Sequence, residues 1–492
     1  MTAASFIVDE DKQEKTGSSD DDLISSELTL QQTLQKQQSA FLNNPYPLLD
    51  ERIAHLKALK QALKENRSAF VDAIDADFGG RARNETLVGE FMPVLENISY
   101  TLKRLSKWMK PRRRHLAMQL QPASAKVVFQ PLGVVGVVVP WNYPLQLSAL
   151  PLVTALAAGN RVMIKMSEYT PKTSTLFAEV IARTFPDDLV TVINGDAEVG
   201  AAFTRLPFDH VLFTGSTEVG RHVMKAAAEN LTPVTLELGG KSPVIINDDF
   251  PLDEAAERIC FGKSINAGQT CVAPDYILLK ESQKEAFVAA YKKAFGKMYP
   301  SVNNSKDYSA IVNERQFTRL ESALEDARVK GADIRPVTDD KINDGSRRMV
   351  PHLILNPTDD MTIMQEEIFG PLLPVVAVDD LANAISFVQA RPRPLALYYF
   401  GLDKRQQEKV VLSTHAGGVS INDTLTHAIV DDMPFGGIGS SGMGHYHGHE
   451  GFLALTKTKS VLSKGKLNSS TLIYPPYTGI KKLVVRFLTG GG

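Results

Sequence analysis

The sequence predicts an α/β protein whose main part is a doubly wound, mostly parallel sheet. Between residues 126 and 246, short β-branched runs alternate with helical stretches. The runs are Val134–Val139, Val162–Ile164, Val190–Ile193, Val211–Phe213 and Val234–Leu236. They are apolar on both faces, as strands covered by helices on each side require. Strands and helices that alternate in this way are typical of doubly wound folds, whose ligands bind at the carboxyl ends of the strands.

Helices are predicted before this sheet, and a second α/β region is predicted after it. Apolar residues from Ile53 to Ile74 recur mainly at three- and four-residue spacing, with Gly79 as a stop. A second helix should run from about Glu85 to Met109, ending before Pro111. The basic run 112–114 that follows is interpreted as a solvated face or subunit contact rather than a phosphate site. The second α/β region extends over about 237–420, and the Gly- and Pro-rich stretch 434–439 is predicted to be an ordered, close-packed loop.

Composition excludes several classes of protein. The 492 residues allow about three structural units. Lys plus Arg number 54 against 56 Asp plus Glu, a balance that argues against a nucleic-acid binder. The longest apolar run, 132–140, is too short to span a membrane. Residues 1–27 are acidic and Ser-rich, which predicts a disordered tail rather than a signal peptide, and hence a cytoplasmic protein.

The chain has two cysteines, Cys260 and Cys271, too few for a disulfide scaffold or a four-thiolate zinc site. His445 and His447 have no third ligand at a recognisable spacing, so we expect no metal.

Three residues are candidates for covalent catalysis. Cys271 lies on a turn whose backbone N–H groups could stabilise a nucleophilic thiolate; the alternative is an inert thiol. Glu237 ends an apolar strand before two glycines, a setting that raises a carboxyl pKa toward the range of a general base; the alternative is a surface carboxylate paired with Lys241. Asn142, held between two prolines, offers a rigid amide donor for an oxyanion, or else caps a turn.

Two loops are candidates for binding a nucleotide. Gly215, Ser216 and Gly220 follow a strand and open a helix, where backbone amides favour phosphate; an ordinary strand–turn–helix connection is the alternative. Lys165 and Glu168 follow another strand and could hydrogen-bond ribose hydroxyls, unless they form only a surface ion pair. A carboxylate near the 2′ position disfavours a phosphate there, which predicts NAD over NADP.

Five motifs, in family order, resemble those of the aldehyde dehydrogenase superfamily. They are 140–144 (PWNYP), 213–216 (FTGS), 237–243 (ELGGKSP), 268–271 (GQTC) and 367–371 (EIFGP). The resemblance extends from about residue 35 to 465. The extension 271–276 (CVAPDY) resembles the class 3 branch, and 422–425 and 442–448 are similar to bacterial coniferyl aldehyde dehydrogenases.

The resemblance implies a role for each matching residue. Cys271 would attack the aldehyde, Asn142 and the Cys271 N–H would hold the oxyanion, and Glu237 would activate the water that hydrolyses the resulting thioester. The cofactor would be bound through the adenosine ribose, the pyrophosphate and the nicotinamide. The residues implied are Trp141, Lys165, Glu168, Gly215, Ser216, Gly220, Glu367 and Phe369. One departure is Met166, where the family commonly has Pro, so the ribose geometry is less constrained here.

The resemblance also implies the architecture and the reaction. Residues 28–112 and 132–236 would bind NAD (NADP being possible), 237–420 would be catalytic, and 113–131 with 455–475 would form a small β bridging element that pairs subunits into a homodimer. The implied reaction oxidises an aromatic aldehyde such as coniferaldehyde, or a medium- or long-chain aliphatic aldehyde, to its acid. A CoA-acylating aldehyde dehydrogenase and a cysteine hydrolase are the alternatives.

Overall fold

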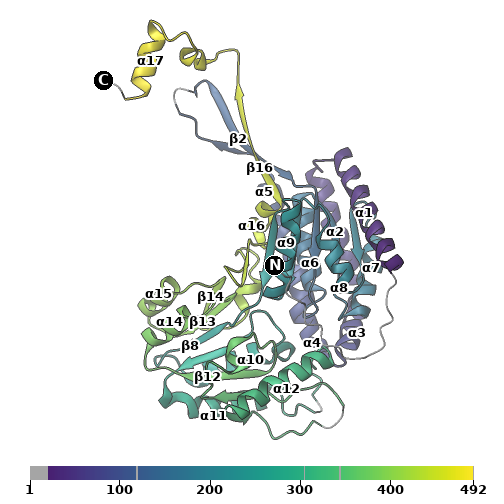
Figure 1. The fold of residues 1–492 in the computed structure, drawn as a ribbon, viewed down its shortest axis with the longest axis vertical. Helices are drawn as coiled ribbons and strands as arrows, with labels where there is room; N and C mark the ends of the chain where they lie inside the picture. Colours follow the sequence, from purple (N-terminus) through teal and green to yellow (C-terminus); the bar gives the residue numbers. More distant parts are fainter. Residues whose placement is uncertain (1–19, 118–119, 304, 343–344, 491–492) are drawn as a thin grey trace, which may run out of the picture.

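The fold of the chain is seen in a computed structural model that describes residues 20–117, 120–303, 305–342 and 345–490. Its strands form three sheets, of six, seven and three strands. The six- and seven-stranded sheets lie in the body of the molecule, and the three-stranded sheet projects from it (Figure 1).

The six-stranded sheet contains every strand predicted between residues 126 and 246. Its order is β15-β7-β6-β3-β4-β5, and only β15 is antiparallel to its neighbour. The strands are β3 (Val134–Val138), β4 (Arg161–Lys165), β5 (Val190–Ile193), β6 (His210–Gly215), β7 (Val234–Leu238) and β15 (Gly442–Met443). The helices that connect them are α6 (Gln146–Ala158), α7 (Pro171–Thr184), α8 (Ala197–Thr204) and α9 (Thr217–Glu229). The prediction of a doubly wound parallel sheet is therefore confirmed.

The amino-terminal helices differ in detail from the prediction. The apolar pattern from Ile53 to Ile74 covers two helices, α2 (Leu49–Glu65) and α3 (Arg67–Phe78), because the chain turns at Asn66. Gly79, with φ 67°, ends α3 as expected. The predicted helix from Glu85 is also divided. It comprises α4 (Arg83–Thr86), a π-helical turn η1 (Leu87–Phe91) and α5 (Met92–Trp108).

The predicted disordered tail 1–27 is too long by at least eight residues, because α1 begins at Asp20 and continues to Asn43. Residues 1–19 lie outside the described part of the chain. Helix α1 is held on the body by Leu30 and Leu34, which are buried, and by Gln37, whose Nε2 donates to the Val162 carbonyl at 3.1 Å. These three residues lie after the acidic stretch 20–22 in the sequence, and the helix that they anchor includes this stretch at its amino-terminal end.

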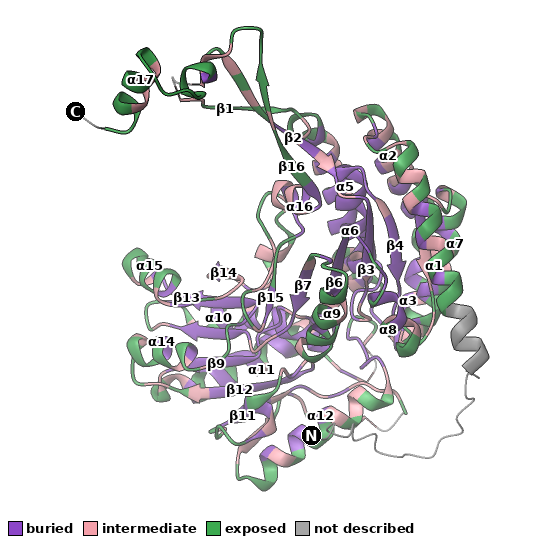
Figure 2. Cartoon of the chain, turned by 45° about the horizontal axis from the view of Figure 1, so that its top comes forward, coloured by how far each residue is buried: buried purple, intermediate pink, exposed green. Residues whose placement is uncertain are grey.

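The seven-stranded sheet forms the second α/β region, in the order β10-β11-β12-β9-β8-β13-β14, with β10 antiparallel to β11. The strands are β8 (Pro243–Ile246), β9 (Tyr276–Leu279), β10 (Asp333–Pro336), β11 (His352–Leu355), β12 (Leu372–Ala377), β13 (Ala396–Phe400) and β14 (Gly418–Ile421). The helices of this region are α10 (Leu252–Ser264), α11 (Lys284–Met298), α12 (Glu314–Val329), α13 (Thr362–Gln365), α14 (Leu381–Gln389) and α15 (Lys404–Ser413). Figure 2 shows that the central strands of both large sheets are buried, whereas the edge strands are partly exposed.

The third sheet joins β1 (Arg112–Arg114) and β16 (Thr456–Lys464) to the edges of β2 (Ala123–Pro131). It extends away from the two large sheets and leads to α17 (Ile480–Leu488), while α16 (Gly448–Ala454) precedes it (Figure 1). The basic residues of β1 are exposed. No helix among the described residues is both long enough and apolar enough to span a bilayer.

Gly442 on β15 tests whether the close pairing of β15 with β7 stabilises the protein. Its φ is 139°, and a Cβ there would lie 2.0 Å from the Leu236 carbonyl oxygen of β7. We expect Gly442→Ala to destabilise the protein by ~1–3 kcal/mol, because a left-handed backbone and a steric clash act together. The midpoint of thermal unfolding, followed by circular dichroism, should fall by several degrees. Gly465→Ala is the matched control, since a Cβ there meets no atom within 4 Å. Equal midpoints for the two variants would contradict this account.

Candidate active site

Cys271 lies on an irregular turn between the two large sheets. It follows α10 and a short 3-10 turn, η3 (Ile265–Gly268). Within that turn Asn266 and Ala267 both have φ 51°, and Gly268 has φ 75°. A Cβ at Gly268 would lie 2.5 Å from the Gly370 carbonyl oxygen, so only glycine fits this close approach. The turn brings the thiol out of the core, as the sequence predicted.

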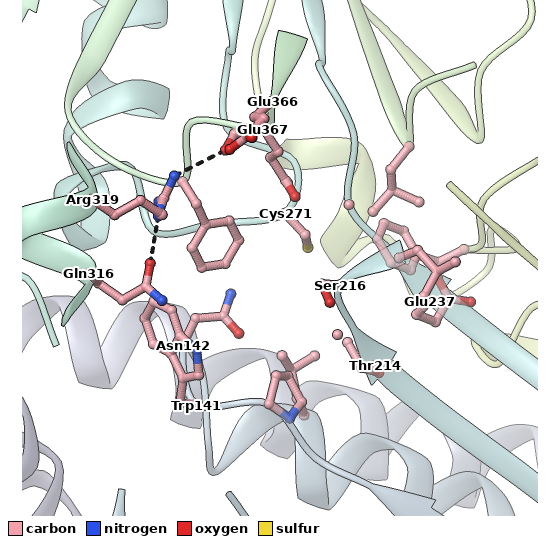
Figure 3. Close-up of a pocket in the computed structure, with 18 of the residues that line it drawn as sticks. Trp141, Asn142, Thr214, Ser216, Glu237, Cys271, Gln316, Arg319, Glu366 and Glu367 are labelled. Carbon is pink, nitrogen blue, oxygen red and sulfur yellow. Dashed lines mark hydrogen bonds between the residues drawn. The ribbon is translucent and has the colours of Figure 1, made fainter. Parts of the chain in front are cut away.

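The Cys271 thiol separates two cavities. One, of about 330 Å³, contains Asn142 and Glu237 in its lining (Figure 3). The other, of about 140 Å³, is lined mainly by apolar residues, among them Val88, Met92, Phe261, Ile265, Leu425 and Ile429. Phe435 and Tyr446 line both cavities. A thiol that lines two cavities can meet a different molecule in each.

The surroundings of Cys271 favour the neutral thiol. Burial, together with the carboxyl groups of Glu367 and Glu237, raises its pKa to about 12, while backbone N–H groups act in the opposite direction. The other cysteine, Cys260, is fully buried, with Sγ 3.8 Å from the Ser264 hydroxyl. Cys260 lines neither cavity beside Cys271 and so fits the inert alternative.

Asn142 is buried beside Cys271, and its amide is held at several points. Its Nδ2 donates to the Gln269 carbonyl at 3.2 Å. Its backbone carbonyl accepts from Arg81 Nη1 at 2.7 Å and from Asn266 Nδ2 at 3.0 Å. The side-chain bond reaches Gln269, which is distant in the sequence, so the alternative of a simple turn cap does not describe this amide.

Glu237 lies on β7, with 3% of its surface exposed. Neither of its carboxylate oxygens has a hydrogen-bond partner in the described part of the chain. Burial therefore raises its pKa well above the ordinary value. The alternative pairing with Lys241 is excluded, because Lys241 binds the Asp275 carboxylate and the carbonyls of Ile363 and Glu366, at 2.7 and 2.9 Å.

The loop 434–439 is close-packed over this carboxylate, as the sequence predicted. A Cβ at Gly436 would lie 3.1 Å from Oε1 of Glu237 and 2.1 Å from the Gly444 carbonyl oxygen. The Glu237 carboxylate thus has a tight backbone cover at Gly436, and the residue as a whole lines the larger cavity.

The larger cavity also collects residues predicted for the nicotinamide and pyrophosphate. Trp141, Gly215, Ser216, Glu367 and Phe369 all line it. The rings of Trp141 and Phe369 meet edge to face, with centroids 5.2 Å apart. Burial raises the pKa of Glu367 to about 8, and Ser216 caps α9 by accepting from the Val219 N–H at 3.3 Å.

Lys165 and Glu168 line a separate cavity of about 590 Å³ beside α8 and α9. Lys165 is 3% exposed, and its Nζ donates to the carbonyls of Met166 and Gly195, at 2.7 and 2.8 Å. Its distance to the Glu168 carboxylate is 3.8 Å. A surface ion pair does not describe this buried lysine, whereas Glu168 is exposed to the cavity and could accept hydrogen bonds from a ligand.

One predicted cofactor residue is placed elsewhere. Gly220 lies on the buried face of α9, where a Cβ would be 2.6 Å from Leu238 Cδ2, and it lines none of these three cavities. A glycine at this position allows close packing of α9 on β7.

The site contains residues that sequence reasoning missed. Arg319 and Gln316, both from α12, line the larger cavity. Arg319 donates to the carbonyls of Glu367 and Ile368, at 3.4 and 2.7 Å, and to Gln316 Oε1 at 2.9 Å (Figure 3). No local pattern distinguishes these two from other polar residues of an amphipathic helix. Phe435 lies within the Gly-rich stretch 434–439, and Tyr446 lies shortly after it. The high density of Gly and Pro in this stretch was the sequence signal that could have pointed to these two residues.

The residues that the structure describes include no group of three or more His, Cys, Asp or Glu side chains able to hold a metal ion. His447 instead stacks on Phe435, with centroids 5.1 Å apart, and burial lowers its pKa to about 4.

Comparisons with known proteins agree on one family. The model of the aldehyde dehydrogenase family matches residues 29–461. A probable coniferyl aldehyde dehydrogenase from Pseudomonas aeruginosa is 57% identical, over 92% of this chain and 94% of that protein. A coniferyl aldehyde dehydrogenase from a Pseudomonas species is 45% identical, over 89% of this chain and 92% of that one.

Solved structures are similar over the same range. The substrate-bound AldH of Staphylococcus aureus has a TM-score of 0.88 and 39% identity, covering 93% of this chain and 99% of its own. An aldehyde dehydrogenase of Mycobacterium tuberculosis complexed with NAD+ has a TM-score of 0.82 and 30% identity, with coverages of 90% and 91%. The alternatives of acyl transfer to CoA and of cysteine hydrolysis gain no support from these relatives. The chain belongs to the aldehyde dehydrogenase family, and NAD(P)-dependent oxidation of an aldehyde is its activity.

Proposed function

We propose that Cys271, Asn142 and Glu237 carry out this oxidation as nucleophile, oxyanion donor and general base. The observation that supports the proposal is that all three side chains line one cavity, at the border of a second, apolar one. Covalent catalysis would divide the reaction into an oxidation and a hydrolysis, each easier than the direct conversion.

In the first half, the Cys271 thiolate attacks the aldehyde carbon and a thiohemiacetal forms. Asn142 Nδ2 and the Cys271 N–H donate to the oxygen that becomes negative. The nicotinamide cofactor, when bound, accepts the hydride that leaves this carbon. A thioester remains on Sγ. Trp141, Ser216, Glu367 and Phe369 would hold the nicotinamide and pyrophosphate, and Lys165 with Glu168 the adenosine ribose.

In the second half, Glu237 takes a proton from water, which attacks the thioester carbon. The C–S bond breaks, the carboxylic acid leaves, and the proton held by Glu237 passes to Sγ, which restores the Cys271 thiol. A carboxylate with no hydrogen-bond partner and a raised pKa is suited to accept that proton.

We infer an aromatic, coniferaldehyde-like substrate and a preference for NAD. The apolar lining of the smaller cavity suits a flat, apolar molecule, and the two named Pseudomonas relatives are coniferyl aldehyde dehydrogenases, one of them probable. Glu168 supports NAD, because its carboxylate would repel a phosphate at the ribose 2′ position.

We also propose that the three-stranded sheet and the segment after it join two copies of the chain. Helix α17 has no buried residue, and Leu483 and Phe487 are 66% and 82% exposed. Further apolar side chains are exposed at Leu467, Leu472, Ile473 and Ile480. A continuous exposed apolar surface of this kind is typical of an interface, and a second copy is the partner that the homodimer prediction names.

A panel of aldehydes tests the substrate and the cofactor. With coniferaldehyde, benzaldehyde, hexanal and acetaldehyde, kcat/KM for coniferaldehyde should exceed that for acetaldehyde by at least ~10-fold, because more apolar surface is buried. NAD should be preferred over NADP by ~10-fold or more, equivalent to ~1.4 kcal/mol. Absorbance of the reduced nicotinamide measures each rate. Glu168→Gln should decrease the ratio of kcat/KM with NAD to kcat/KM with NADP. An unchanged ratio would show that Glu168 does not determine the cofactor preference.

Variants of the proposed base and nucleophile separate the two halves of the reaction. Glu237→Gln should lower steady-state turnover by ~10²–10⁴-fold, because hydrolysis loses its general base. It should still form one reduced cofactor per site in the first turnover. Cys271→Ala should form none.

The pH dependence provides a second check. The raised pKa of Glu237 means that its carboxylate form increases with pH. Wild-type turnover should therefore rise with pH, and Glu237→Gln should lose this contribution to the pH dependence. Wild-type turnover by Glu237→Gln would refute the assignment.

The dimer is tested by charging the apolar face of α17. Size-exclusion chromatography with light scattering should give the mass of two chains for the wild type, and a shift toward one chain for Leu483→Lys combined with Phe487→Lys. Val329→Lys, at a residue 78% exposed on α12, is the control and should leave the mass unchanged. A monomeric wild type would exclude the proposal.

A further inference from the structure

A buried carboxylate from the amino-terminal helices contacts the turn that carries the proposed nucleophile. Glu85 lies on α4, and its Oε2 accepts from the Asn266 backbone N–H at 3.1 Å and from the Ser309 hydroxyl at 2.5 Å. Its Oε1 is buried with no hydrogen-bond partner in the described residues. Glu85 therefore joins three segments of chain, two of which belong to the second α/β region.

The contact continues from Asn266 to Asn142. Asn266 Nδ2 donates to the carbonyls of Asn142 and Gln269, both at 3.0 Å. Asn266 has φ 51° and ψ 29°, a left-handed conformation that is uncommon for residues other than glycine, although asparagine adopts it more readily than most. Two contacts hold Asn266 from the side of the cofactor-binding sheet, namely the bond from its N–H to Glu85 and the bond from its Nδ2 to the Asn142 carbonyl.

Arg81 holds Asn142 from the other side. Its Nη1 donates to the Asn142 carbonyl at 2.7 Å, and its guanidinium lies over the rings of Phe78 and Tyr143, at 4.8 and 4.7 Å from their centroids. Arg81 is 3.5 Å from Glu90, and neither side chain is exposed. The Asn142 backbone is thus held between Arg81 and the Asn266 side chain.

We propose that Glu85 is a positioning residue, which aligns Asn142 and Cys271 by fixing the Asn266 turn. The proposal rests on the function proposed above for those two residues. Glu85 lines neither cavity beside the thiol and touches no reacting atom, so its effect passes through hydrogen bonds alone. Misplacing a reacting group by ~1 Å can cost about 10²-fold in rate.

Glu85 also makes this alignment depend on pH. Burial, with a smaller contribution from Asp307, raises its pKa to about 7, against the opposing effects of the Ser309 hydrogen bond, Arg81 and the Asn266 N–H. Tyr299 also faces it. Below this pKa the carboxyl group is neutral and accepts more weakly from Asn266, so alignment should be best above neutrality.

The test compares Glu85→Ala and Glu85→Gln with Glu96→Gln, an exposed glutamate on α5 that serves as the control. Glu85→Ala should lower the first-turnover rate constant by ~10–100-fold, with the KM for NAD within about twofold of wild type. Glu85→Gln keeps one acceptor oxygen, so its first-turnover rate constant should decrease less than that of Glu85→Ala. The ratio of wild-type to Glu85→Gln rate should fall as pH decreases from 8 to 6, because only the wild type loses a charge.

The outcomes are distinguishable. A folded Glu85→Ala enzyme with a wild-type first-turnover rate, even at a lower melting temperature, would overturn the proposal and leave Glu85 a purely structural role. If Glu85→Ala does not fold, the ratio of the wild-type rate to the Glu85→Gln rate tests the proposal instead. A ratio that stays constant with pH would overturn the proposal. Activity that survives Cys271→Ala would instead refute the proposed function, whatever the Glu85 variants do.

Discussion

Asn142 and Cys271 belong to different sheets of the protein, and the hydrogen bonds of the Asn266–Gln269 turn hold them together. Gln269 is the centre of this arrangement. Its carbonyl accepts from both asparagines, and its side chain donates to the carbonyls of Asn266 and Ala310, at 2.9 and 3.0 Å. Its Oε1 accepts from the Val312 N–H at 2.9 Å. Since every partner is buried, loss of one bond would leave a polar group unpaired at a cost of about 1–3 kcal/mol. The remaining geometry of the site depends on this turn.

The electrostatics of the site disfavour negative charge on its ionisable groups. The thiol of Cys271 and the carboxyls of Glu237 and Glu367 all have raised pKa values, because burial disfavours their charged forms. At Cys271 the two carboxyl groups add to this effect. A ligand that carries positive charge would favour the thiolate by direct attraction.

The sequence predicted the strands and most of the site-lining residues, and its errors have identifiable causes. Apolar spacing could not detect the turn at Asn66 or the π-helical turn at 87–91, because both keep the buried face of the helices nearly in phase. Gly220 was assigned to phosphate from its place after Ser216, but its helical phase turns it toward Leu238. The acidic stretch was read as a tail from composition, whereas α1 is anchored by Leu30, Leu34 and Gln37, which follow it. Arg319 and Gln316 had no local signal, since only packing brings α12 to the cavity.

The sequence by itself determined the fold class, the family motifs and the chemical types of side chain available at positions 142, 237 and 271. These features depend on hydrophobic periodicity and local turns, which are set by residues close together in the sequence. The tertiary structure decided which alternative each residue adopts. Lys241 binds Asp275 rather than Glu237, and Lys165 is buried rather than paired at the surface. It also decided that Glu85, about 180 residues before Asn266, reaches the turn that carries Cys271. Such contacts depend on how two sheets pack, and desolvation depends on everything that covers a group, so neither can be derived from sequence spacing.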